Sequence, residues 1–315
     1  MKVLVTGANG FVGQAVLLRL NRMTGVTAVG SVRRAGMVAD AGAPLVKVGE
    51  LSAKSDWSGA LAGVQAVVHT AARVHVMQEA AADLLDEFRR VNVHGTLNLA
   101  RQAAAGGVRR FVFVSSIKVN GEATQLGHPF TADDTPAPLD AYGVSKMKAE
   151  QGLREIGCQT GMEVVIIRPP LVYGPGVKAN FAAMMRWLKR GVPLPLGAIY
   201  NQRSLVALDN LVDLIVTCLT LPAAAHQTFL VSDGEDVSTT VLLRRMGQSL
   251  GCPARLVPVP LSWLKLAAAV VGKPDVAQRL CGSLQVDIEK TRCLLGWTPP
   301  ISLDDGLKRA AGNTG

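Results

Sequence analysis

Aromatic side chains are scarce in this sequence, at 4% of its 315 residues, and they are not interleaved with runs of lysine or arginine. Proteins that bind single-stranded nucleic acids usually stack the bases on aromatic side chains in a basic groove. The formal net charge of +9 is carried by scattered basic residues instead. Such a surface suits a phosphorylated small-molecule ligand, and equally suits simple solubility, so no nucleic-acid partner is expected.

Cysteines are few and have no ligand spacing. The five of them, Cys158, Cys218, Cys252, Cys281 and Cys293, form neither a Cys-x-x-Cys pair nor a Cys/His cluster. We therefore expect reduced thiols in a cytoplasmic protein and no metal site.

Long apolar runs are missing as well. No run reaches the roughly 18 residues that cross a membrane. The longest candidate, residues 261–271, is interrupted by Lys265 and is expected to be a buried helix, with a helix docked on a membrane surface or on a partner as the alternative. The chain begins directly on a strand-like segment, so no signal peptide is expected.

The start of the chain carries the most informative pattern. The apolar run Val3–Val5 is typical of a buried parallel strand, and Gly7, Gly10 and Gly13 follow it before a helical pattern begins. Gly7 permits a tight turn, Gly10 permits close approach of a pyrophosphate, and Gly13 permits the helix to pack against the strand. Free N–H groups at a helix N-terminus bind phosphate. The pattern predicts a dinucleotide site that also includes Phe11 and Val12.

Strand-like runs then alternate with helical patterns. The expected strands are Thr27–Val32, Leu45–Val48, Ala66–His69, Arg110–Ser115 and Val164–Arg168, and the expected helices are Gln14–Asn21, Trp57–Leu61, Leu84–Ala104 and Tyr142–Arg154. Strands separated by helices predict an α/β protein with a Rossmann-type doubly wound parallel sheet.

The domain organisation follows from a change of composition after residue 170. Residues 1–170 are assigned to the dinucleotide-binding domain. Residues 171–202, rich in proline and glycine, and the helical residues 233–315 predict a smaller, mostly helical substrate lobe. Residues 203–232 contain two further strand-like runs and are expected to return to the main sheet.

The end of the second expected strand bears on the cofactor. Arg33 and Arg34 stand there, and no carboxylate does. An acidic residue at this place binds ribose hydroxyls, whereas a basic residue accommodates a 2′-phosphate. NADP(H) is therefore favoured over NAD(H), which stays open. Further cofactor contacts are expected from residues after the third and fourth strands, namely Glu50, Leu51, Thr70, Ala71 and Ala72.

Tyr142 and Lys146 have the spacing that brings two side chains to one face of a helix. A free tyrosine has a pKa of about 10, and a neighbouring ammonium lowers it enough for acid/base work near neutral pH. Ser116 follows the fifth expected strand, at the sheet edge where ligands bind. These three residues predict a catalytic group that acts on a carbonyl or alcohol.

At this point the chain resembles the extended short-chain dehydrogenase/reductase family of nucleotide-sugar epimerases, dehydratases and reductases, along its whole length. The matching pieces are residues 6–13, 69–72, 92–96, 115–116, 142–146, 168–169 and 173–175. The resemblance implies an NAD(P)-dependent enzyme with Ser116, Tyr142 and Lys146 as catalytic residues. It also implies cofactor contacts from Asn92, Ser115 and Pro169, and contacts with the diphosphate of a UDP-sugar from Asn180 and Arg203.

Residues 115–122 and 71–77 are similar to a bacterial subgroup that reduces the C4 keto group of UDP-4-keto-6-deoxy-N-acetylhexosamines for surface polysaccharide, such as lipopolysaccharide. Asn120 stands where UDP-glucose 4-epimerases usually carry tyrosine. The resemblance thus favours such a 4-reductase, with Lys118 and His75 beside the sugar.

Two other functions stay open. One is a UDP-hexose 4-epimerase that retains NAD, and the other, from a different class, is a non-catalytic NADP-sensing protein; a 4,6-dehydratase is less favoured. In this family two long helices, here Leu84–Ala104 and Tyr142–Arg154, often pair between subunits, so a homodimer is expected.

Overall fold

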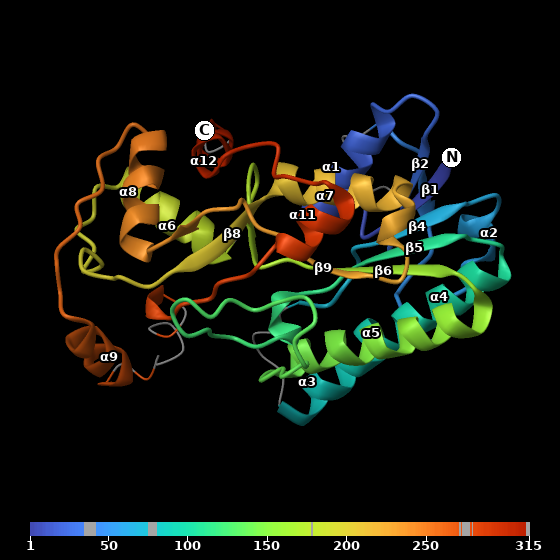
Figure 1. Cartoon of the computed structure of the whole chain (residues 1–315), viewed down its shortest axis with the longest axis horizontal. Helices are drawn as coiled ribbons and strands as arrows, with labels where there is room; N and C mark the ends of the chain where they lie inside the picture. The colour runs from blue at the N-terminus through green and yellow to red at the C-terminus, as the bar shows by residue number, and fades with distance from the viewer. Residues whose placement is uncertain are drawn as a thin grey trace.

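The computed structural model describes residues 1–34, 42–74, 81–177, 179–270, 272, 278 and 280–312. Its larger part is built on a seven-stranded sheet in the order β3-β2-β1-β4-β5-β6-β9, in which every pairing is parallel (Figure 1). The strands are β1 Lys2–Thr6, β2 Thr27–Val32, β3 Leu45–Lys47, β4 Ala66–His69, β5 Arg110–Val114, β6 Glu163–Arg168 and β9 Thr228–Leu230. The strand order reverses at β1 and β4, so the predicted doubly wound Rossmann-type sheet is confirmed.

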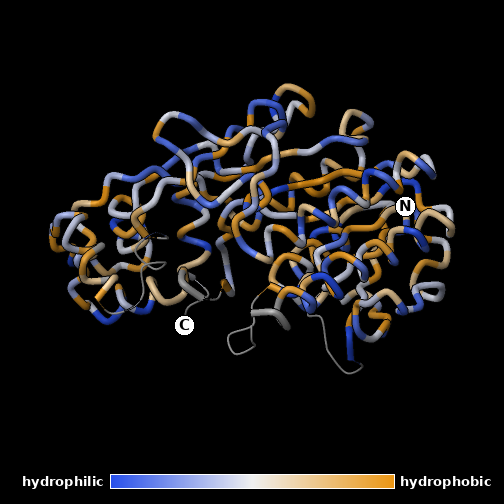
Figure 2. Tube along the Cα trace, turned by 90° about the horizontal axis from the view of Figure 1, so that it is seen from below, coloured by the Kyte–Doolittle hydropathy of each residue, from blue (hydrophilic) through white to orange (hydrophobic). Residues whose placement is uncertain are grey.

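Helices cover both faces of this sheet (Figure 1). One face carries α1 Phe11–Asn21, α7 Leu208–Thr220 and α11 Glu289–Leu295, and the other carries α2 Ser58–Leu61, α4 Thr96–Ala105 and α5 Ala141–Thr160. Helix α3 Ala81–Phe88 packs on α5. A π-helical segment, η1 Arg89–Gly95, joins α3 to α4. Apolar residues concentrate along the strands and on the helix faces that meet them (Figure 2), which leaves the carboxyl ends of the strands for polar chemistry.

The smaller lobe surrounds a second sheet in the order β10-β8-β7. Its strands are β7 Leu171–Tyr173, β8 Arg203–Ala207 and β10 Asp236–Val237, and its helices are α6 Ala179–Lys189, α8 Thr239–Ser249, α9 Leu261–Val270 and α12 Leu303–Gly312. Two short 3-10 turns, η2 Ile117–Val119 and η3 Pro222–Ala224, complete the described elements. A separate apolar cluster holds this lobe together.

The expected return of residues 203–232 to the main sheet is half right. Strand β9 joins its edge beside β6, but β8 pairs with β7 and β10 in the small sheet. The reason lies just after β6, where Pro169 and Pro170 have no N–H to continue the ladder. The chain therefore leaves the main sheet there, and β7 becomes the partner that β8 needs.

Helix α9 is not buried as the sequence predicts. Trp263, Leu266 and Val270 are exposed, at 72%, 68% and 79% of their surface. The helix lies at the far end of the lobe, away from both sheets, so neither sheet covers its apolar face (Figure 1). Within the described residues no helix has the length and apolar character needed to span a membrane.

Candidate active site

The turn between β1 and α1 has the geometry that the glycine pattern predicts. Gly7 adopts a φ of 67°, a left-handed conformation that favours glycine, and its carbonyl accepts a hydrogen bond from the Gly10 N–H at 2.8 Å. A Cβ on Gly13 would lie 2.2 Å from that same carbonyl oxygen. Gly10 caps α1 without a side chain, so the first N–H groups of α1, those of Phe11 and Val12, face outward for an anion.

The substitution Gly13→Ala is expected to cost about 1–3 kcal/mol of unfolding free energy and to weaken dinucleotide binding, because the turn must open to admit the methyl group. Chemical denaturation and cofactor titration measure the two effects. The matched control is Gly59→Ala on α2, where a Cβ meets nothing within 4 Å. Its stability should stay unchanged or rise by up to about 1 kcal/mol. Equal behaviour of the two variants would contradict the packing argument.

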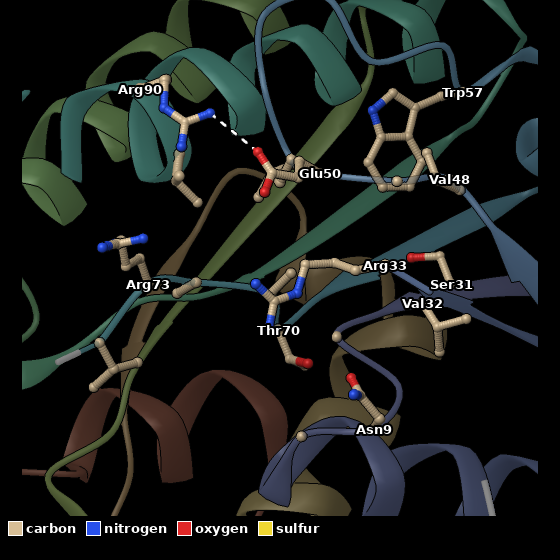
Figure 3. Close-up of a pocket in the computed structure, with 18 residues that line it drawn as sticks. Asn9, Ser31, Val32, Arg33, Val48, Glu50, Trp57, Thr70, Arg73 and Arg90 are labelled. Carbon is tan, nitrogen blue, oxygen red and sulfur yellow. Dashed lines mark hydrogen bonds and ion pairs between the residues drawn. The ribbon is translucent and has the colours of Figure 1, made fainter. Parts of the chain in front are cut away.

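A cavity of about 540 Å³ opens at the carboxyl ends of β1, β2 and β4 (Figure 3). That size suits a small-molecule or cofactor site. The structure brings eight of the predicted cofactor residues together in its wall. They are Gly7, Gly10, Arg33, Glu50, Leu51, Thr70, Ala71 and Ala72.

Three arginines converge on this cavity. Arg33 reaches across it from the end of β2, between Glu50 and Thr70 in the view of Figure 3. Arg90 lies 3.4 Å from Glu50 and 2.9 Å from Glu87, and Arg73 lies 3.2 Å from Glu87. Hydrogen bonding to Arg90 lowers the pKa of Glu87 below its usual value, so the carboxylate stays charged. Because three arginines and one carboxylate, Glu50, line the cavity, its wall has a basic character that fits the phosphates of a dinucleotide.

Sequence reasoning missed Asn9, Arg73 and Arg90 as cavity residues. Arg73 directly follows the predicted Thr70–Ala72 segment, and extending that segment by one residue would have included it. Arg90 lies on η1, more than twenty positions after β4, and no local pattern in the sequence connects it to the cavity.

Helix α5 positions the two central catalytic candidates. Asp140 caps its N-terminus by accepting a hydrogen bond from the Gly143 N–H at 2.6 Å, and Gly161 ends it at a φ of 74°. Tyr142 and Lys146 lie one turn apart. Lys146 is 2% exposed, donates from Nζ to the Val114 carbonyl at 2.9 Å and sits 4.4 Å from the centre of the Phe113 ring. Burial lowers its pKa to about 7, although Glu150 opposes the shift.

The pKa of Tyr142 differs from the sequence prediction. Its ring is partly buried, edge-on to Phe88 with the centroids 6.0 Å apart. Burial raises the pKa of the phenol well above its usual value, and the nearby Asp140 carboxylate raises it further. The expected lowering by Lys146 is therefore wrong for this state, because Lys146 Nζ donates to Val114 and lies 5.9 Å from the centre of the Tyr142 ring.

Ser116 lies just beyond the carboxyl end of β5, which ends at Val114, as the sequence predicts. Its hydroxyl caps η2 by accepting a hydrogen bond from the Lys118 N–H at 3.3 Å. The first turn of α5 packs against η2 so closely that a Cβ on Gly143 would lie 2.7 Å from the Lys118 carbonyl oxygen. Pro169 accepts from the Ile117 N–H at 3.0 Å. The ends of β5 and β6 and the start of α5 thus meet at one place, beside the predicted nicotinamide position.

Two predicted cofactor residues have other partners. Asn92, on η1, is buried; its amide bonds the backbone of Arg73 at 2.8 and 3.1 Å and the hydroxyl of Ser145 at 3.0 Å. A π-helical segment often marks a functional site, and here it lets Asn92 join the loop after β4 to α5. Ser115 donates to Glu150 at 2.6 Å, inside the helix–sheet interface. Neither residue lines this cavity, and both side chains join neighbouring segments of the fold, so their contacts with the cofactor stay predictions.

Ser115 belongs to a buried polar group centred on Glu150 and Arg168, neither of which was predicted as a site residue. The Arg168 guanidinium binds the Glu150 carboxylate at 2.9 and 2.6 Å and also donates to Asn120 at 2.9 Å. Both residues are at most 2% exposed. Because Glu150 is on α5, Arg168 ends β6 and Asn120 follows η2, this pair ties together the three segments that carry Tyr142, Pro169 and Ser116.

The predicted substrate residues lie on the lobe side or at the rim. Arg203 begins β8, is largely buried, and donates to the Gly282 carbonyl at 3.0 Å; burial lowers its pKa. Asn180 is on α6, but its side chain is outside the described residues, as is all of His75. Lys118 pairs with Glu122 at 3.0 Å and with Asp140. Its ammonium therefore already has two carboxylate partners, which the sequence did not indicate.

The protein combines a doubly wound sheet, a glycine turn, a dinucleotide-sized cavity at the strand reversal and a Tyr-x-x-x-Lys pair. Together these features are those of a nicotinamide-dinucleotide enzyme fold. The chain belongs to the NAD dependent epimerase/dehydratase family, whose model matches residues 3–232. This confirms the resemblance at the level of the family.

Individual relatives cover nearly the whole chain. A UDP-glucose 4-epimerase of Vibrio cholerae is 49% identical over 310 residues, which are 98% of this chain and 94% of that protein. Among solved structures, a UDP-N-acetylglucosamine 4-epimerase from Bacillus cereus has a TM-score of 0.82 at 20% identity and covers 100% of both chains. MoeE5, in complex with UDP-glucose and NAD, has a TM-score of 0.79 at 24% identity and covers 100% of this chain and 98% of its own. These two structures support the fold alone.

Proposed function

We propose that the protein is a UDP-hexose 4-epimerase that retains its nicotinamide cofactor. The single observation that carries this proposal is the 49% identity, over almost the full length, with a UDP-glucose 4-epimerase. The sequence motifs favoured the 4-keto reductase and left the epimerase as an alternative. The relatives favour the epimerase.

The cavity fits such a cofactor. Gly7 and Gly13 approach their neighbours so closely that a side chain at either position would occupy the turn, and α1 directs free N–H groups there. A bound nicotinamide dinucleotide would supply the hydride acceptor and donor for C4 of the sugar. Lys146, beside Tyr142, is suited to bond the nicotinamide ribose, and Arg33 and Arg90 are suited to the charged adenosine half.

The residues of this chain then handle the proton and the position of the sugar. In its phenolate form Tyr142 takes the C4 hydroxyl proton as the sugar is oxidised, and as the phenol it returns that proton when the sugar is reduced on its other face. Ser116 hydrogen-bonds the same oxygen. Arg203 at the start of β8 is suited to the diphosphate of the UDP group, with Asn180 on the same lobe. Tyr142 moves the proton, and the other residues bind or orient the sugar. Most of the gain in reaction rate comes from this positioning.

A second candidate function uses the same residues, but the enzyme would release its cofactor after each turnover. It is the NADP(H)-dependent reduction of a UDP-4-keto-6-deoxy-N-acetylhexosamine for surface polysaccharide. Arg33 at the end of β2, where no carboxylate stands, favours a 2′-phosphate, and Asn120 departs from the tyrosine that epimerases usually carry. Asn120 instead bonds Arg168, so its role here is structural.

The deciding experiment follows the cofactor and the sugar together. Purified protein is denatured and the released nucleotide is identified by mass spectrometry. Native protein is then incubated with UDP-glucose and with UDP-N-acetylglucosamine without added reductant. We expect bound NAD(H) or NADP(H) and formation of the 4-epimer with no net change in NAD(P)H absorbance.

Stoichiometric loss of NADPH absorbance with a UDP-4-keto sugar, and no epimer from either UDP-hexose, would support the reductase instead. Cofactor binding without turnover of any UDP-sugar would contradict both enzymatic proposals and favour a sensing protein. Light scattering on the same sample tests a homodimer, which we propose through residues 84–104, in α3, η1 and α4, and through α5.

A further inference from the structure

The ammonium of Lys118 lies between two carboxylates at the edge of the active site. It binds Asp140, and it binds Glu122 at 3.0 Å. Asp140 is the residue that caps α5, through the hydrogen bond from the Gly143 N–H. The Lys118 and Asp140 side chains are 33% and 36% exposed, so the pair stands at the rim, neither buried nor free in solvent.

The same lysine is joined to the other half of the catalytic group through its backbone. Its N–H donates to the Ser116 hydroxyl at 3.3 Å, and its carbonyl oxygen lies against Gly143, with only 2.7 Å to an added Cβ. A backbone hydrogen bond of 2.9 Å from the Ala137 N–H to the Val119 carbonyl joins the two segments a second time. The Lys118–Asp140 pair therefore spans the contact between η2, which carries Ser116, and the start of α5, which carries Tyr142.

We propose that Lys118 is a positioning residue for Tyr142: it holds η2 against the start of α5 and neutralises the Asp140 carboxylate beside the phenol. This inference rests on the proposed function, because it concerns how Tyr142 moves its proton. It also gives Lys118 a role other than the sugar contact that the sequence predicts.

The charges around the phenol make the direction of the effect clear. Lys146 on α5 lies 5.9 Å from the centre of the ring, Asp140 precedes Tyr142 by two residues at the N-cap of α5, Lys118 lies on η2, and Phe88 from α3 adds no charge. Of these, Asp140 is the one that raises the pKa of Tyr142 in addition to burial. Without the Lys118 ammonium, the carboxylate would act on the phenol unopposed, and Tyr142 would lose its proton only at still higher pH.

The test compares Lys118→Met, Lys118→Arg, Asp140→Asn and the double variant in the epimerase assay across pH. We expect Lys118→Met to move the acidic limb of the kcat profile up by about one pH unit, which lowers kcat on that limb about tenfold. KM should change less than about twofold, since no sugar contact is lost. Lys118→Arg keeps the charge and should stay near the wild type.

Asp140→Asn keeps the helix cap, because an amide oxygen still accepts the Gly143 N–H, but removes the charge. In the double variant the limb should therefore return close to its wild-type position, a coupling that a merely structural pair would not show. Glu122→Gln is the matched control: it removes the other carboxylate partner of Lys118, and it should shift the limb by less than a few tenths of a pH unit.

A rise in KM with kcat unchanged would overturn the proposal in favour of a sugar contact, as would a limb that does not move in Lys118→Met. Hydrogen–deuterium exchange gives a readout that needs no turnover. Lys118→Met should exchange several-fold faster than Glu122→Gln over residues 116–119 and 140–144. Equal exchange in the two variants would contradict the proposal that Lys118 holds η2 against the start of α5. If the wild-type protein epimerises no UDP-sugar, the proposed function is contradicted. The exchange result then decides whether Lys118 holds η2 against the start of α5.

Discussion

The variant Tyr142→Phe is expected to lose turnover of the sugar by at least about 10²–10⁴-fold, the range that a positioned acid/base group contributes. The phenol is the group proposed to carry the C4 proton, and the phenylalanine ring keeps the edge contact with Phe88. Cofactor affinity should change little, since the cavity that fits the dinucleotide is formed by other residues. Steady-state kinetics and a fluorescence titration of the cofactor measure the two quantities.

The matched control is Tyr200→Phe. Tyr200 is 81% exposed, so this substitution removes a phenolic hydroxyl from the surface. It should keep its rate within about twofold, because a surface hydroxyl contributes little. Turnover that persists in Tyr142→Phe, or that falls equally in both variants, would show that the proton travels by another route.

Breaking the buried pair of Glu150 and Arg168 should produce the largest loss of stability. Substituting Glu150→Leu alone leaves the Arg168 guanidinium buried without its bidentate partner, which typically costs about 3–5 kcal/mol. Ser115 loses its acceptor as well. Urea denaturation measures the change in unfolding free energy, and kcat should also fall, because α5 is no longer tied to the end of β6.

An exposed ion pair of the same length is the control. Lys290 and Asp133 are also 2.6 Å apart, but Asp133 is 73% exposed, so Asp133→Asn should cost no more than about 1 kcal/mol. The double variant Glu150→Leu with Arg168→Met should be less destabilised than Glu150→Leu alone, since no charge is left uncompensated. A loss in Glu150→Leu as small as in the control would refute the role of this pair.

Much of the candidate site could be predicted because its parts are local. The spacing of Gly7, Gly10 and Gly13 reflects the turn that follows β1, and the structure shows the close contacts that exclude side chains there. The spacing of Tyr142 and Lys146 reflects a single helical turn. Arg33, Glu50 and Thr70 follow three parallel strands, whose carboxyl ends always meet at one edge of the sheet.

Where prediction failed, the deciding contact joins segments far apart in the chain. Ser115 stands next to Ser116, yet it turns to Glu150, 35 residues later. Arg90 is held at the cavity by its ion pair with Glu50, a residue 40 positions earlier in the chain. Strand β8 has the composition of a main-sheet strand, but the prolines after β6 direct it to β7.

The sequence alone determined the alternation of strands and helices, the glycine turn and the candidate catalytic side chains, because these depend on residues within a few positions of one another. Only the tertiary structure decided how those side chains are charged. Desolvation and the nearest carboxylate set the pKa of Tyr142 and Lys146, and both depend on which distant segments pack around them. For that reason the pKa of Tyr142 is raised although Lys146 lies one helical turn away. The lysine that we propose offsets the charge of Asp140, Lys118, belongs to η2 instead.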